Sequence, residues 1–240
     1  MSIKDNFVSN EDVKLHYLDG NEIIDYSLKP LLHIPGAFGS AESFLTDLKS
    51  LSPRRVISMS QRGRGKSDVP TSGYTFENLM LDIQSIVEAA KLKKFYLYAF
   101  SLGVPAALGY ACKFPEKIEG LIIGDYPAKY PRLSEEWIEK FLPYPELVNP
   151  KAVLGTQRES KEVHLWDELK MIQCPVLILT GGNAQVEPKV VLSKEELERY
   201  RTTLSDVSIV KFIHSGHRLW EPDHEKYIIT IKEFLHKHDK

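Results

Sequence analysis

A serine lies where an apolar segment of the chain gives way to a segment of helical character. Residues 97–110 read LYAFSLGVPAALGY, and Ser101 stands at the change, with the small residues Ala99 and Gly103 two positions to either side. The pattern is similar to G-x-S-x-G, which marks a sharp turn from strand to helix with no room for bulky neighbours. The first amides of the helix favour negative charge beside the hydroxyl. The pattern predicts a nucleophile at Ser101, and an ordinary helix N-cap is the alternative.

A serine hydroxyl needs a base within hydrogen-bond distance before it can act as a nucleophile. His217 follows Gly216 in the stretch FIHSGHRLWEPD, between an expected last strand and an expected last helix. This loop position indicates His217 as the base, whereas His214 is expected at the strand end. The alternative is a histidine with only a structural role. An acid is expected between the serine and the histidine along the chain.

The elements that must position these residues alternate between short apolar strands and helices. We expect strands at residues 7–9, 13–18, 31–34, 55–59, 95–99, 121–123, 175–180 and 207–213, and helices at 75–92, 102–113, 193–204 and 224–236. This alternation predicts an α/β fold with a mostly parallel, doubly wound sheet and helices on both faces. In such sheets reactive groups gather at the carboxyl ends of the strands, where Ser101 is expected.

One region interrupts the alternation. It holds five of the prolines and two tryptophans, and we interpret residues 127–172 as a short helical cap on a core of residues 1–126 and 173–240. Helices are expected in the cap at 134–142 and 161–171. Apolar side chains of the cap and core are candidates to line a substrate pocket, namely Trp137, Phe141, Tyr144 and Trp166 with Phe38, Phe100 and Leu219. The alternative is that the cap aromatics only pack the cap onto the core.

Composition excludes several classes of partner. The net charge of −2 offers no broad basic surface for nucleic acid. The two cysteines, Cys112 and Cys174, form no disulfide framework, and they fit a reducing compartment. The first residues lack a secretory signal, and no apolar run reaches the length of about 18 residues that a membrane helix needs. We expect a cytoplasmic protein that binds neither nucleic acid nor membranes, and the histidine spacing predicts no metal site.

Five short fragments of the sequence are informative because of the order in which they occur along the chain. They read LLHIPGAFGS, VISMSQRGRGKSD, AFSLG, CPVLILTGG and SGHRLW. Together they resemble the α/β-hydrolase fold family over nearly the whole chain, with Pro35 in the place of a usual histidine. The resemblance implies that Ser101 is the nucleophile and that His217 is the general base and then the acid. It also implies an oxyanion hole made of the backbone N–H groups of Ala37 and Leu102, although the Ala37 segment has an ordinary strand-to-loop turn as its alternative.

The position of the acid in the sequence differs from the usual pattern of this family. Most members carry an aspartate shortly after the glycine that corresponds to LTGG, but here Ala184 stands at the matching position and the next carboxylate is Glu187. Some members place the acid after the preceding strand, and the stretch EGLIIGDYP offers Asp125 there. Asp125 is therefore the candidate acid, which would set the tautomer of His217 and stabilise its imidazolium. An ordinary loop aspartate is the alternative.

A serine nucleophile narrows the reactions that the resemblance implies. The haloalkane dehalogenases and epoxide hydrolases of the family use aspartate, and its dienelactone hydrolases use cysteine. We expect a carboxylic ester hydrolase that acts on a small molecule through an acyl-enzyme, with thioesters and lactones as related substrates and with no cofactor. One alternative is a cofactor-free lyase or haloperoxidase on the same fold. The other is a ligand receptor or signalling partner with little turnover.

Overall fold

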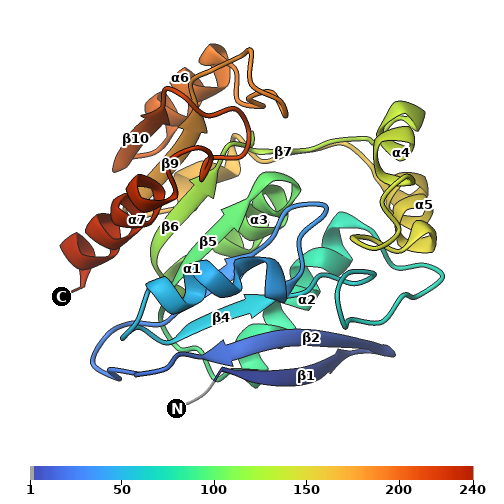
Figure 1. The fold of residues 1–240 in the computed structure, drawn as a ribbon, viewed down its shortest axis with the longest axis horizontal. Helices are drawn as coiled ribbons and strands as arrows, with labels where there is room; N and C mark the ends of the chain where they lie inside the picture. The colour runs from blue at the N-terminus through green and yellow to red at the C-terminus, as the bar shows by residue number, and fades with distance from the viewer. Residues whose placement is uncertain (1–2, 240) are drawn as a thin grey trace.

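A computed structural model describes residues 3–239 and shows one eight-stranded sheet (Figure 1). In spatial order the strands are β1 (Lys4–Asn10), β2 (Val13–Gly20), β4 (Val56–Met59), β3 (Leu31–Ile34), β5 (Phe95–Phe100), β6 (Ile118–Gly124), β9 (Val176–Gly181) and β10 (Val207–Phe212). The pairs β1–β2 and β2–β4 are antiparallel, and the other neighbouring pairs are parallel. The expected α/β fold with a mostly parallel sheet is confirmed.

Helices cover both faces of this sheet. The helices α2 (Phe76–Ala89), α3 (Val104–Lys113) and α6 (Lys194–Thr203) pack on one face, and α1 (Leu45–Ser50) and α7 (His224–His238) pack on the other (Figure 1). Thr75 caps α2 by accepting a hydrogen bond from the Asn78 amide, and Ser193 and Glu196 form a capping box at α6. The strands β3 and β4 are buried at every position because both of their faces are covered, which explains their uninterrupted apolar sequence.

The segment between β6 and β9 forms a cap whose helices differ from the expected ones. It contains α4 (Glu135–Phe141), α5 (Pro150–Glu159) and a two-stranded sheet of β7 (Lys129–Tyr130) and β8 (Val163–His164). The prediction for α4 is confirmed, but the helix predicted at 161–171 is wrong. That stretch holds β8 and a 3-10 turn at Glu168–Met171. The helix forms earlier because Pro150 suits its first position and Asn149 accepts a hydrogen bond from the Lys151 amide.

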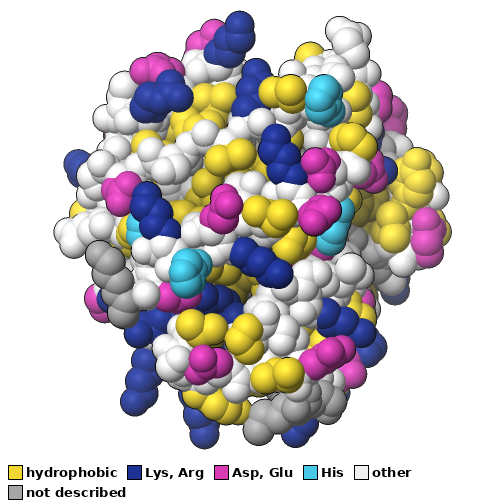
Figure 2. All heavy atoms as spheres, turned by 60° about the vertical axis from the view of Figure 1, so that its left-hand side comes forward, with side chains coloured by type: hydrophobic (Ala, Val, Ile, Leu, Met, Phe, Trp, Pro, Cys, Tyr) yellow, Lys and Arg dark blue, Asp and Glu magenta, His cyan; other side chains and the backbone are white. Residues whose placement is uncertain are grey.

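Charged side chains of both signs mix on the face of the molecule shown in Figure 2. Dark blue Lys and Arg side chains lie among magenta Asp and Glu side chains there, in keeping with the net charge of −2. Among the described residues on this face, no extended patch carries a single charge. Within residues 3–239, no helix has the length and apolar character needed to cross a bilayer.

Candidate active site

Ser101 lies at the corner between β5 and α3. Its backbone φ is +51°, a conformation that residues with a side chain rarely adopt and that the sharp turn imposes. The corner is tightly packed, because a Cβ added to Gly103 would lie 2.4 Å from the carbonyl oxygen of Pro35. A Cβ added to Gly36 would lie 2.8 Å from the Cβ of Ser101. The chain therefore requires glycine at both positions to bring the loop after β3 against the serine.

The side chain of Ser101 contacts His217 and does not cap a helix. Phe100 is the cap of the 3-10 turn that begins at Ser101, and Gly103 is the cap of α3. Ser101 Oγ donates a hydrogen bond to His217 Nε2 over 2.8 Å. The opposite ring nitrogen, Nδ1, donates to Asp125 Oδ2 over 2.7 Å. These roles follow from the partners, since a carboxylate oxygen accepts and a hydroxyl can donate. The structure thus joins the three predicted residues in one chain of hydrogen bonds.

Asp125 is enclosed at the carboxyl end of β6, where its side chain is fully buried. Its Oδ2 accepts from His217 and also from the Val191 amide over 2.9 Å. Its Oδ1 accepts from the Thr180 hydroxyl over 2.9 Å and from the Leu192 amide over 3.5 Å. Four donors therefore hold the carboxyl group in one orientation toward the imidazole. Thr180, Val191 and Leu192 were not among the predicted site residues, and two of them act through backbone amides that no residue type signals.

The loop after β9 supports the site through its main chain. Ala184, at the position where the family usually has its acid, is exposed, and the side chain of Glu187 is 73% exposed. The Pro188 carbonyl accepts a hydrogen bond from the His217 amide over 2.6 Å. With the Val191 amide on Asp125, backbone atoms of this loop contact two members of the set. The loop thus positions a histidine and a carboxyl group without supplying a side chain to either.

Two backbone amides belong to the segments that meet at the serine corner. Leu102 follows Ser101 directly, and Ala37 follows Gly36, which packs against the serine. Among the hydrogen bonds between described residues, neither the Ala37 nor the Leu102 amide has an acceptor. Amides with open donors at this position can hold negative charge that develops on a substrate oxygen. The arrangement fits the oxyanion hole that the family resemblance implies.

Two buried side chains brace the loop that carries Ala37. Gln61 Nε2 donates a hydrogen bond to the Pro35 carbonyl over 2.7 Å. Arg64 Nε donates to the Ala37 carbonyl over 3.2 Å. Both side chains come from the loop after β4, so neighbouring strands jointly fix the direction of the peptide groups next to Ser101.

Four of the predicted pocket residues form an aromatic cluster that links the Ala37 loop to the cap. The Phe38 ring stacks on Phe141 with centroids 4.0 Å apart, and Phe141 stacks on Trp137 with centroids 4.3 Å apart. Tyr144 meets Phe38 edge-on at 5.7 Å. The Phe100 ring lies apart from this cluster and stacks on the imidazole of His217 at 4.8 Å. Aromatic surface therefore lies both at the cap and at the histidine.

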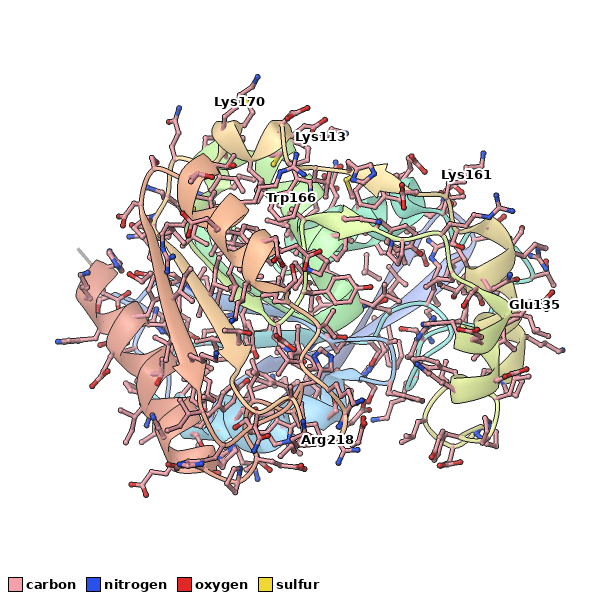
Figure 3. The ribbon with its side chains drawn as sticks, turned by 90° about the horizontal axis from the view of Figure 1, so that it is seen from above. Lys113, Glu135, Lys161, Trp166, Lys170 and Arg218 are labelled. Atoms are coloured by element: carbon pink, nitrogen blue, oxygen red, sulfur yellow. The ribbon has the colours of Figure 1, made fainter. Side chains whose placement is uncertain are left out.

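The structure does not bring Trp166 or Leu219 into this aromatic cluster. Trp166 is buried and packs against the Tyr200 ring of α6, with centroids 4.8 Å apart. Figure 3 shows Trp166 far from Arg218, the residue that follows His217. Leu219 is fully buried in the apolar core that includes α7. Both side chains complete the core, on opposite faces of the sheet. Neither belongs to the aromatic cluster, and the pocket role expected for them stays a prediction.

One group of potential metal ligands lies outside this site. Atoms of Asp5, His16 and Glu42 that could bind a cation lie within 4.8 Å of one another. The Lys66 ammonium pairs with both carboxylates, and His16 Nδ1 forms a hydrogen bond with Ser60 Oγ over 3.1 Å. Protein groups already complement these ligands, so we assign no metal to them.

Comparisons with known proteins agree with this architecture. An esterase from Rhodococcus sp. ECU1013 has a structure that matches with a TM-score of 0.79 at 18% identity, covering 99% of this chain and 100% of the esterase. A bromoperoxidase from Bacillus anthracis matches with a TM-score of 0.79 at 17% identity, over 97% of this chain and 100% of that protein. A proline iminopeptidase from Lactobacillus helveticus is 30% identical over 126 residues, which are 49% of this chain and 43% of the peptidase.

The chain thus spans less than half of the length of that peptidase, whereas it covers the two solved structures almost completely. At these identities the solved structures establish the fold alone. The family model of the alpha/beta hydrolase fold matches residues 29–213, which include the strands from β3 to β10. The matched range, the sheet order and the serine corner at the end of β5 lead to one assignment: the chain belongs to the α/β-hydrolase family.

Proposed function

We propose that this chain is a serine hydrolase that cleaves small to medium carboxylic esters through an acyl-enzyme. The observation that carries the proposal is the continuous hydrogen-bond chain from Ser101 through His217 to Asp125. A histidine that accepts from a serine and donates to a buried acid can remove the hydroxyl proton and carry the resulting positive charge. Thioesters and lactones contain the same acyl carbon and belong to the same proposal.

The proposed reaction begins when His217 takes the proton of Ser101 and Ser101 Oγ attacks the ester carbonyl carbon. The tetrahedral oxyanion is stabilised by the amides of Ala37 and Leu102. Protonated His217, stabilised by Asp125, then gives its proton to the leaving alcohol, and the acyl-enzyme forms. Water repeats the sequence on this intermediate, so that the acid leaves and Ser101 regains its proton.

The aromatic cluster supports a preference for apolar groups near the reacting carbon. Phe38 directly follows the proposed oxyanion residue Ala37, and its ring carries the stack of Phe141 and Trp137 from the cap. Pockets for small molecules are lined largely by such side chains. We therefore propose that the cap limits the length of the group that occupies this side of the site.

The names of two similar proteins point to other reactions that the same residues could carry out. The names of the iminopeptidase and the bromoperoxidase indicate peptidase and peroxidase activity. An assay can distinguish either activity from ester hydrolysis. A receptor with little turnover is the remaining alternative. The four donors that orient Asp125 favour an enzyme, because ligand binding alone does not require a charge behind an imidazole.

The test is hydrolysis of p-nitrophenyl esters from acetate to octanoate by the wild type and by Ser101→Ala. A matched control is Ser205→Ala, which removes a hydroxyl from an exposed position. The proposal predicts that turnover falls to background in Ser101→Ala and is unchanged in Ser205→Ala. Prolyl amide substrates, cyanohydrins and halide with peroxide are assayed in parallel. Turnover of one of these with no ester hydrolysis would replace the esterase proposal with the corresponding reaction, and turnover of none would favour a receptor.

A further inference from the structure

Arg64 is a buried arginine at the junction of the core and the cap. Arg64 is 3% exposed, and its backbone forms an antiparallel bridge with Val148 of the cap. The loop that carries it follows β4 and also braces the Ala37 segment. Its guanidinium therefore lies close to the proposed oxyanion hole and beneath cap residues.

The guanidinium of Arg64 has no acidic partner within residues 3–239. Nε donates to the Ala37 carbonyl, and Nη1 donates to the Arg62 carbonyl over 2.9 Å. A guanidinium has five N–H donors, so the contacts described leave three of them open. Its neighbour Arg62 differs, because it forms a buried ion pair with Asp82. Burial lowers the pKa of Arg64, as expected for a cation that has lost water and gained no counter-charge.

A second open donor lies in the same region. Tyr130, on β7 of the cap, is fully buried, and its hydroxyl has no hydrogen-bond partner in the described part of the chain. Burial raises the pKa of Tyr130 to about 12, while the charge of Arg64 acts in the opposite direction on it. A buried hydroxyl without a hydrogen-bond partner is unfavourable, and so is a buried cation without an opposite charge. Arg64 and Tyr130 act on each other electrostatically, and an anionic group in contact with both would satisfy both.

We propose that Arg64 and Tyr130 bind a carboxylate at the far end of the substrate, and that the enzyme acts on half-esters of short dicarboxylic acids. A carboxylate matches the planar fork of a guanidinium and can accept a further hydrogen bond from the tyrosine hydroxyl. The inference rests on the proposed ester hydrolysis and narrows its substrate. In the reaction, water and the half-ester yield the dicarboxylic acid and the alcohol, and no other reactant is needed.

The position of Arg64 links this binding to the chemistry. One of its nitrogens holds the carbonyl of Ala37, and the amide of that same residue is a proposed oxyanion donor. A carboxylate on the open nitrogens would therefore lie next to the segment that carries this proposed oxyanion donor. Arg64 is a specificity residue in this proposal, because it touches the substrate away from the bond that breaks.

The test separates binding from turnover. Calorimetry measures the affinity of Ser101→Ala for ethyl hydrogen succinate, glutarate and adipate, and for the neutral amide of the same shape in each case. The proposal predicts that one acid binds at least about tenfold more tightly than its amide, as a charge-assisted pair requires. Adding Arg64→Gln should reduce this ratio to about one, whereas Arg64→Lys should keep part of it. Arg201→Gln removes a charge from the surface of α6 and should leave the ratio unchanged.

Tyr130→Phe provides a second variant that keeps Arg64 in place. Its hydroxyl has no partner in the structure, so the substitution removes no protein hydrogen bond, and it should weaken binding of the acid several-fold without affecting the amide. Equal binding of every acid and its amide by Ser101→Ala would overturn the proposal. An unchanged ratio of acid to amide affinity in Arg64→Gln would also overturn the proposal. The only role left for Arg64 would then be to hold the Ala37 carbonyl. Tight acid binding with no turnover in the wild type would instead overturn ester hydrolysis and leave the carboxylate site standing.

Discussion

The contact between Asp125 and His217 leads to a prediction for Asp125→Asn. At Oδ2 the backbone amide of Val191 is a fixed donor, and it lies beside the Nδ1 atom of His217, which also contacts Oδ2. The hydroxyl of Thr180, which donates to Oδ1, can turn to the Gly181 carbonyl 3.3 Å away. The new amide nitrogen should therefore settle on the Thr180 side, and its oxygen should keep facing His217. The substitution then preserves the tautomer, and it removes the negative charge and the acceptor for the Leu192 amide.

The size of the effect follows from that charge. Attraction between unit charges about 4 Å apart is worth about 4 kcal/mol at an effective dielectric constant of about 20. If the imidazolium loses this stabilisation in the transition state, kcat should fall about 1,000-fold. KM should change little, because the charge on His217 develops only during the reaction. The melting temperature should fall only slightly, since the bond that is lost, from the Leu192 amide, is 3.5 Å long and the bonds at Oδ2 are kept.

The assay is steady-state hydrolysis of the best p-nitrophenyl ester, with the melting temperature measured in parallel. Glu187→Gln is the matched control, because this carboxylate follows the usual acid position but is exposed, and its kcat should equal that of the wild type. A fall of less than tenfold in Asp125→Asn with unchanged stability would refute the reasoning that Asp125 stabilises the imidazolium. An equal loss in the control would show that the loop, and not the buried charge, governs activity.

Three further substitutions test packing and protonation. Gly36→Ala should lower kcat about 100-fold by pushing on Ser101, whose Cβ would lie 2.8 Å from the added methyl group. Asp82→Ala leaves Arg62 buried without its partner and should lower the free energy of unfolding by about 3–5 kcal/mol in urea titrations. Burial lowers the pKa of His33 to about 3, so the unfolded chain binds a proton there before the folded chain does, and stability should fall by up to about 1.4 kcal/mol per pH unit from about pH 6.5 to about pH 3. This component should vanish in His33→Gln.

Two of these substitutions have a control variant, and the first has an outcome that would contradict it. Wild-type kcat in Gly36→Ala would mean that the loop can move away from the serine without loss of function. Glu198→Ala breaks an exposed ion pair with Arg201 and should change stability by less than about 1 kcal/mol. His164→Gln removes an exposed histidine and should keep the pH dependence of the wild type. If His33→Gln keeps it too, the acid sensitivity belongs to other groups.

Local patterns predicted most of the fold. Strands such as β3 and β9 are short apolar runs that can lie only inside a covered sheet, so their positions in the sequence nearly match the structure. The cap was harder, since α5 begins with an Asn-Pro pair that also fits a turn. The sequence around β8 is rich in helix formers, but it pairs with β7 and packs Trp166 into the core. Tertiary contacts decided these segments against local preference.

The candidate site, like the fold, could be predicted from the sequence only in part. Ser101 and His217 lie in short motifs, whereas Asp125 could be proposed only because the usual position holds Ala184. The hydrogen bond between Asp125 and His217 spans 92 positions of the chain, a pairing that no spacing rule reports. The open donors of Arg64 and Tyr130 were equally hidden, because only a folded chain shows which polar groups have partners.

The loop after β9 has a consequence for how this protein can change. Its Pro188 carbonyl and Val191 amide do the positioning, and these atoms are the same whatever side chains the neighbouring residues carry. Natural or directed evolution could therefore replace the exposed residues Ala184, Gln185 and Glu187 while His217 and Asp125 keep their positions. Because the proposed acid follows β6, the loop after β9 supplies no side chain to the proposed site, and substitutions in it should be tolerated more readily than in a loop that carries the acid.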